Sequence, residues 1–279
     1  MTLSGIALSL FSISVVAGLL GALLGIGGGL IVIPALTLLY DLDIRLAIGA
    51  SAVSIIATSS GAAVAYLRDR LTDVRIAVLL EVGTTAGALT GALLAGVVSP
   101  RYLYLAFGAV LLYSALAMYR SRRQELPGEV RPDALSRWLR LEGEYYDPAL
   151  GRTVSYRAGR ALPGLFIMYG AGIVAGLLGI GSGIFKVLAM DQVMKLPIKV
   201  STATSNFMIG VTAAATAAVY LARGQIAPGV AAPVALGVLT GATLGTRLMV
   251  RLRGRTLRAL FIPILLVTAL QMFWRGWQG

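Results

Sequence analysis

Two glycine-rich stretches, GIGGGLIVIP at residues 25–34 and GIGSGIFKVL at residues 179–188, each follow a long apolar run. A shift of 154 residues superimposes the two stretches, and the match continues without a gap far enough to align Ser51 with Ser205. Self-similarity at a fixed spacing indicates an internal duplication. The sequence therefore predicts two homologous halves, and the glycine cluster is the feature that opens each of them.

The composition indicates a membrane protein. Of the 279 residues, 57% are hydrophobic and 13% are charged, and the mean hydropathy is +0.84. Several apolar runs are long enough to cross a bilayer as helices. The chain has no cysteine and no histidine, which excludes disulfides, thiol catalysis and metal sites built from those ligands. We expect no cofactor, no metal and no enzymatic activity, and a lipid bilayer as the surroundings.

The net charge of +12 is unevenly distributed. Residues 120–160 hold nine arginines and six acidic residues, whereas residues 161–279 hold ten basic residues and one acid, Asp191. Outside the linker, the basic residues gather in short loops between apolar segments, which membrane topology explains better than a nucleic-acid partner. We expect a first membrane repeat at residues 1–119, a cytoplasmic linker at 120–160 and a second repeat at 161–279.

The same basic loops predict the orientation of the helices. With the linker in the cytoplasm, equivalent segments of the two repeats run in opposite directions, and both termini lie on the periplasmic side of a bacterial inner membrane. The predicted class is an all-α polytopic membrane protein with two inverted-topology repeats, each a glycine-broken membrane hairpin plus three transmembrane helices. Inverted repeats recur in secondary transporters. The expected spans are residues 45–67, 75–97, 102–119, 198–222, 227–248 and 259–274.

The glycine clusters interrupt the first apolar helix of each repeat. We expect helices at residues 5–24 and 162–178, followed by short arms at 30–40 and 184–194. An arm of about 11 residues rises about 1.5 Å per residue and covers only about half of a bilayer core of about 30 Å. Each repeat therefore predicts a hairpin that enters the membrane and turns at its glycines.

Two functions compete for these glycines. Close helix packing suits the strict four-residue spacing of two other glycine rows, Gly83/Gly87/Gly91 and Gly237/Gly241/Gly245. The clusters instead follow an i, i+2, i+4 spacing that keeps no single helical face, which favours a broken element at a substrate site. Neither cluster matches a nucleotide-binding pattern. The candidate substrate-binding residues here are Gly27, Gly28, Gly29, Gly181, Ser182 and Gly183.

A lysine stands in the arm of the second repeat only. Lys186 follows Gly183 by three residues, and an ionisable residue within the membrane is a functional candidate by default. It would attract an anion; the alternative is that its side chain extends to the cytoplasmic interface. Glu81 is the only carboxylate well inside a predicted span, and it could pair with a cation or carry a proton in coupling, or lie at the interface.

Uncharged polar residues begin the helix that follows each hairpin. Ser51, Ser205 and Asn206 could donate hydrogen bonds to an oxyanion, and the alternative is that they bond to their own helix.

The segments GLLGALLGIGGGLIVIPAL and AIGASAVSI, repeated as AGLLGIGSGIFKVLAM and VSTATSNF, resemble the sulfite exporter TauE/SafE family of membrane permeases. The resemblance covers nearly all of both repeats. It implies transport of small sulfur-containing anions such as sulfite, sulfoacetate or other sulfonates, usually outward. The second repeat departs from the common pattern, with Ser182 in place of a glycine and Leu188 where the first repeat has Pro34, and the individual anion stays open.

We therefore expect a secondary transporter that exports small sulfur-containing anions by alternating access; an H⁺- or Na⁺-coupled importer of a small organic anion is the alternative. The linker admits three interpretations: an amphipathic surface segment, a small strand pair around GRTVSY, or a disordered tether. The oligomeric state is left open.

Overall fold

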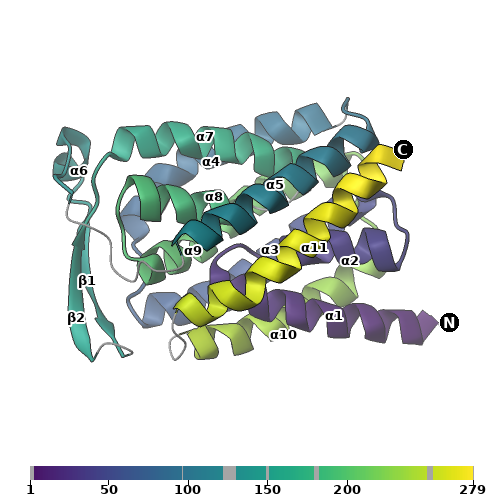
Figure 1. Cartoon of the computed structure of the whole chain (residues 1–279), viewed down its shortest axis with the longest axis horizontal. Coiled ribbons are helices and arrows are strands. Elements are labelled where there is room, and N and C mark those ends of the chain that lie inside the picture. The colour runs from purple at the N-terminus through teal and green to yellow at the C-terminus, as the bar shows by residue number, and fades with distance from the viewer. Residues whose placement is uncertain are drawn as a thin grey trace.

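The computed structural model describes residues 3–95, 97–121, 130–148, 151–178, 182–249 and 254–278, and it is predominantly helical (Figure 1). The elements of the first repeat are α1 (Leu3–Leu24), α2 (Gly29–Leu39), α3 (Ile44–Arg68), α4 (Val74–Ala95) and α5 (Pro100–Ser121). Those of the second are α7 (Ala161–Leu178), α8 (Gly183–Leu188), the π-helix η1 (Ala189–Val193), α9 (Ile198–Ala222), α10 (Pro228–Met249) and α11 (Gly254–Gln278).

The helix boundaries follow the sequence prediction closely. A helix overlaps each of the six expected spans, and each long first helix ends just before its glycine cluster. The arm of the first repeat is the regular helix α2, whereas the arm of the second is α8 continued by η1. Among the described residues, five helices are long and apolar enough to cross a membrane: α1, α3, α4, α9 and α10. The protein is a multi-pass membrane protein.

The two repeats interlock instead of folding side by side. Helix α1 packs against α10, and α7 packs against α4, so the first helix of each repeat lies on the other repeat. Helices α3 and α9 pack together, and so do α5 and α11, the pair that crosses the front of the molecule in Figure 1. Each contact thus joins a helix to its own counterpart or has a matching contact in the other repeat.

The regularly spaced glycines make the interlocking contacts possible. A Cβ atom added at Gly241 would overlap the carbonyl oxygen of Val15 on α1, and one at Gly87 would overlap that of Tyr169 on α7. Val15 and Tyr169 are related by the same 154-residue shift as the glycines. The packing function predicted for these glycine rows is confirmed.

Two tyrosines hold the helices that lead into the glycine clusters. Tyr66 Oη donates to the carbonyl of Ala22 at 2.9 Å, and Tyr220 Oη donates to that of Gly176 at 3.3 Å. Both rings are fully buried. The 154-residue shift carries the first bond onto the second, so the two repeats anchor their broken helices in the same way.

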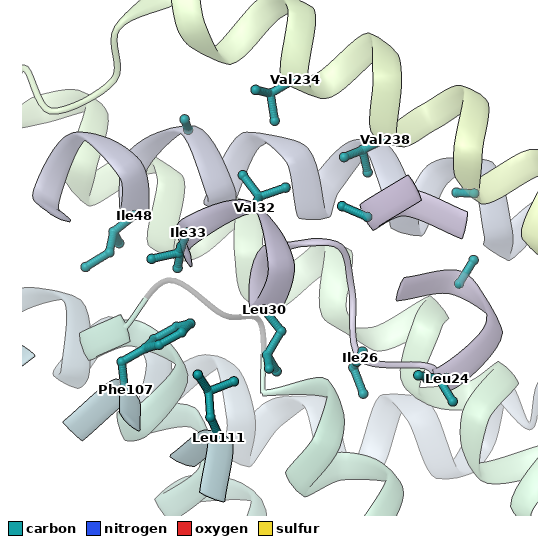
Figure 2. Close-up of a cluster of buried hydrophobic side chains, with 14 of the residues drawn as sticks. Leu24, Ile26, Leu30, Val32, Ile33, Ile48, Phe107, Leu111, Val234 and Val238 are labelled. Carbon is teal, nitrogen blue, oxygen red and sulfur yellow. The ribbon is translucent and has the colours of Figure 1, made fainter. Parts of the chain in front are cut away.

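The apolar core surrounds the first hairpin. Figure 2 shows Val32 of α2 facing Val234 and Val238 of α10, with Leu30 directed toward Leu111 of α5. All of these side chains are buried. The arm of the first repeat is therefore held by aliphatic packing on its neighbours.

The linker forms a small strand pair, which is one of the three alternatives that the sequence left open. Its elements are α6 (Ala134–Trp138), β1 (Glu142–Asp147) and β2 (Arg152–Arg157), and the strands pair antiparallel with Glu142 opposite Arg157. The fold is therefore not helical throughout. The strands lie at one end of the helical bundle, and both chain termini lie at the other end (Figure 1).

Polar contacts attach the strand pair to both repeats. Tyr156 Oη donates to Asp73 Oδ2 at 3.0 Å in the α3–α4 loop, and Lys199 Nζ at the start of α9 contacts Asp147 Oδ1 at 2.7 Å. Burial, followed by the negative charge of Asp73 and the hydrogen bond to it, raises the pKa of Tyr156. The linker thus holds the α3–α4 loop and the start of α9 together.

Candidate functional site

The glycine clusters form turns with positive φ angles, which favour glycine. Gly25 and Gly27 adopt φ values of 71° and 72°, in the left-handed region where a side chain is strained. Ser182, which precedes α8, adopts a φ of 54°, although it is not a glycine. Gly181, a predicted site residue, lies outside the described residues. Helix α1 thus ends before the first cluster, and α8 begins directly after Ser182.

The two turns contact each other directly. A Cβ atom at Gly183 would lie 2.5 Å from the carbonyl oxygen of Gly25 and 2.5 Å from Cα of Ile26. Ser205 Oγ of α9 lies between them, 2.7 Å from the carbonyl of Gly25 and 3.2 Å from that of Gly183. Ser205 therefore joins the first turn to the second, and its hydroxyl proton is used on backbone carbonyls.

The remaining predicted polar residues surround the first turn. Asn206 Nδ2 donates to the carbonyl of Ala22 at 3.0 Å, while Asn206 Oδ1 is buried and has no hydrogen-bond partner among the described residues. Ser51 is completely buried, and an added Cβ at Gly29 would overlap its hydroxyl oxygen. Gly28 caps the start of α2 with ordinary helical angles. The structure thus places Gly27–Gly29, Ser51, Ser205 and Asn206 around the first turn.

Lys186 and Glu81 form a buried ion pair. Lys186 Nζ lies 2.8 Å from Glu81 Oε2, with the lysine side chain 0% exposed and the glutamate side chain 12% exposed. The lysine therefore does not extend to an interface. Of the alternatives for Glu81, pairing with a cation is the one that the structure shows. The pair joins α4 of the first repeat to α8 of the second.

Two threonines complete this cluster, and the sequence analysis did not single them out. Lys186 Nζ donates to Thr212 Oγ1 at 2.6 Å, and Thr212 in turn donates to Glu81 Oε1. Thr85 Oγ1 donates to the same carboxylate oxygen at 3.0 Å. The signal that could have found Thr212 is its counterpart at the same shift, Thr58, although Thr58 Oγ1 bonds to Ser54 of its own helix.

The chemistry of the cluster follows from its charges. Removing two ions from water costs several kcal/mol for each ion, and only close pairing with further hydrogen bonds offsets the cost. Here the carboxylate accepts from one ammonium and two hydroxyls, so the pair is satisfied as it stands. The ammonium can hold a different anion in the same place only when the carboxylate leaves or loses its charge.

Comparison with known proteins agrees with this architecture. The family model for the sulfite exporter TauE/SafE matches residues 10–272. The chain is 24% identical to the probable membrane transporter protein YunE of Bacillus subtilis (strain 168), covering 95% of this chain and 96% of that protein. It is 26% identical to a probable membrane transporter protein of Haemophilus influenzae (strain ATCC 51907 / DSM 11121 / KW20 / Rd), covering 96% of this chain and 95% of that protein.

A probable membrane transporter protein of Xylella fastidiosa (strain 9a5c) is 25% identical, over 94% of each chain. No solved structure gives a significant match. The family match spans nearly the whole sequence, both glycine turns and the Lys186–Glu81 pair included. The chain therefore belongs to the sulfite exporter TauE/SafE family of membrane transporters.

Proposed function

We propose that this chain exports small sulfur-containing anions, such as sulfite, sulfoacetate or other organosulfonates, across the bacterial inner membrane by alternating access. The observation that carries the proposal is a fully buried lysine in a membrane hairpin, beside two glycine turns that contact each other. Family membership supports transport, and the family description supports a sulfur oxyanion. The candidate contacts are the glycine turns, Ser51, Ser205, Asn206 and Lys186.

An inverted-topology repeat accounts for the packing. A two-fold relation between residues 1–119 and 161–279 explains why α1 packs on α10 and α7 on α4, and why α3 and α9 pack on each other. The position of both termini at the end opposite the linker strands supports a cytoplasmic linker and periplasmic termini.

Because the repeats interlock, the rigid units that move against each other in transport cannot be the two repeats themselves. We propose that the moving units are composite: α1, α2 and α3 with α10 form one, and α7, α8 and α9 with α4 form the other. The contact from Ser205 to Gly25 crosses between these units, whereas the ion pair lies within the second unit. Alternating access would then open and close the contact between the two turns.

Two drives are compatible with the site. An inside-negative potential drives a monovalent anion outward by about 2.3 kcal/mol per 100 mV, so uncoupled export needs no second ion. Uncoupled export suits a membrane interior that has almost no carboxylate to carry a proton. Glu81 is such a carboxylate, and it lies in the ion pair with Lys186. A proton-coupled carrier, which imports when the proton gradient points inward, is therefore the second candidate.

Flux through purified protein in liposomes tests the proposal. We expect sulfite or a sulfonate to leave loaded proteoliposomes faster than protein-free liposomes, and Lys186→Ala to abolish the difference. A binding screen against sulfite, sulfate, sulfoacetate, taurine and simple carboxylates identifies the anion. Equal flux with and without the protein for all of them would refute the transport of these anions.

A further inference from the structure

We propose that Glu81 occupies the position of the transported anion at Lys186, so that an anion binds there together with one proton, which is taken up by Glu81. The inference rests on the proposed function in taking this cluster as the transport site. It goes further in assigning a coupling ion and a stoichiometry.

The first step is the contact set of the carboxylate. Glu81 Oε2 faces the Lys186 ammonium at 2.8 Å, and Glu81 Oε1 accepts from the hydroxyls of Thr212 and Thr85. One ammonium and two hydroxyls directed at two oxygens of one group are donors that a sulfonate or sulfite ion could accept in the same way. The carboxylate is therefore a resident occupant of an oxyanion site.

The second step is the balance of charge. In the structure the ammonium and the carboxylate cancel, within a cluster whose lysine is completely buried. A monovalent anion added to this pair would leave one net negative charge in the protein interior, which is costly. If Glu81 takes up a proton from water as the anion arrives, the site is neutral both empty and loaded. On release, the anion departs, Glu81 returns its proton to water, and the ion pair forms again.

The third step is the absence of a competing charge at the carboxylate. Among the described residues, Lys186 is the charged group within hydrogen-bonding distance of Glu81. On the helices that pack against α4, Tyr169 of α7 is exposed, Tyr220 of α9 donates to Gly176, and Lys199 of α9 pairs with Asp147.

Arg75 near the start of α4 donates to the carbonyl of Arg140, and Asp191 lies in η1 beyond α8. The Glu81 side chain is 12% exposed, whereas the Lys186 side chain is completely buried. The carboxylate is therefore the more accessible of the two charged groups.

The consequence is that anion and proton cross in the same direction, one for one. For a monovalent sulfonate the transported charges cancel, so the flux responds to the anion gradient and the pH gradient and not to the membrane potential. Outward transport then runs when the anion is more concentrated inside, and an inward proton gradient favours uptake.

Binding of ethanesulfonate to the purified full-length protein tests the inference, because this anion keeps its single charge throughout the range used. Between about pH 5 and pH 8 we expect Kd to rise with pH and to approach a tenfold rise for each pH unit, as the uptake of one proton on binding requires. Glu81→Gln, which resembles the protonated side chain, should bind at least as tightly as wild type at low pH, with a Kd independent of pH. Asp147→Asn, which removes the charge that pairs with Lys199 at the linker, should keep the wild-type pH dependence.

The outcomes separate the inference from the proposed function. A pH-independent Kd in wild type, with binding lost in Lys186→Met, would overturn proton linkage and leave sulfonate transport standing. Binding of lactate but not ethanesulfonate, with the same proton linkage, would support the inference and reject the sulfur substrate. Loss of pH dependence in Asp147→Asn would overturn the assignment to Glu81.

A second measurement does not require any variant to fold. In proteoliposomes with the potential clamped by valinomycin and potassium, ethanesulfonate efflux should be the same at zero and at inside-negative potential, and it should carry protons out of the lumen. Efflux that accelerates with the potential and moves no protons would overturn the inference.

Discussion

The helix pairs α1–α2 and α7–α8 are related by the 154-residue shift and differ in one charged contact. In the first pair, Val32 of α2 packs among aliphatic side chains of α10. The 154-residue shift aligns Val32 with Lys186. The counterpart of Glu81 under the same shift is Ala235 on α10. Val32 of α2 and Ala235 of α10 thus stand at the positions equivalent to the ion pair of Lys186 in α8 and Glu81 in α4. Both charges therefore belong to a single asymmetric feature.

The backbone of the second hairpin differs in the same place. Helix α2 runs for 11 residues, whereas α8 runs for six and continues as the π-helix η1. Single π-helical turns are rare and are found frequently at functional sites. The irregular backbone and the buried lysine therefore occur together, in the half that we propose to hold the anion.

The strongest test of this difference removes one charge. Lys186→Met leaves the Glu81 carboxylate buried without its cation, and we expect a loss of about 3–5 kcal/mol in the free energy of unfolding, because breaking a buried pair strands the other ion. Lys186→Met/Glu81→Leu should recover most of that loss. Unfolding in detergent measures both. A single variant as stable as wild type would show that the pair is not buried in the membrane-embedded protein.

The shared frame is tested at the packing glycines. Gly241→Ala and Gly87→Ala each place a methyl group against a backbone carbonyl of the opposite repeat, and we expect each to cost about 1–3 kcal/mol, as overpacking does. Gly170→Ala is the matched control, because no atom outside its chain neighbours and its own helix backbone lies within 4 Å of its added Cβ. Similar losses at the two glycines would support the two-fold frame. A loss at one and none at the other would contradict it.

The contact between the two turns gives a smaller effect. Ser205→Ala removes the hydroxyl that lies against Gly25 and Gly183, and we expect a loss of about 0.5–1.5 kcal/mol, as for an ordinary intramolecular hydrogen bond. The control is Ser60→Ala, whose exposed hydroxyl bonds to its own helix. Thermal unfolding measures both variants. Equal losses of stability would show that the contact of Ser205 with the two turns contributes no more than an ordinary hydrogen bond within a helix.

The smallest effect is at the linker. The raised pKa of Tyr156, caused by burial and then by Asp73, means that the folded state favours the neutral phenol. This contribution is fully present below the pKa of free tyrosine, about 10, and is lost as the pH rises through the higher folded value. The protection of the β1 and β2 amides, measured as their exchange rate relative to the intrinsic rate at the same pH, should therefore fall above about pH 10 in wild type. Tyr156→Phe should show a smaller fall, because one of its two causes is gone while Tyr145 of β1 remains; an unchanged profile would exclude Tyr156 as a source.

Local signals predicted the helices, the breaks and the buried charges. The glycine spacing located both turns, and the scarcity of charge in the spans drew attention to Lys186 and Glu81 separately. Their pairing could not be predicted, because it depends on α4 packing against the other repeat, and periodicity says nothing of partners so far apart in sequence. The hydrogen bond from Ser205 to the Gly25 carbonyl could not be predicted either, because the first and second turns are far apart in sequence and meet only in the folded protein.

The most direct test of the central claim is sulfonate flux through Lys186→Met/Glu81→Leu, a variant that removes both charges together. We predict that it folds, retains the melting temperature of wild type within a few degrees, and carries no sulfite or ethanesulfonate in proteoliposomes. Wild-type flux through the folded double variant would contradict the claim that the anion binds at Lys186.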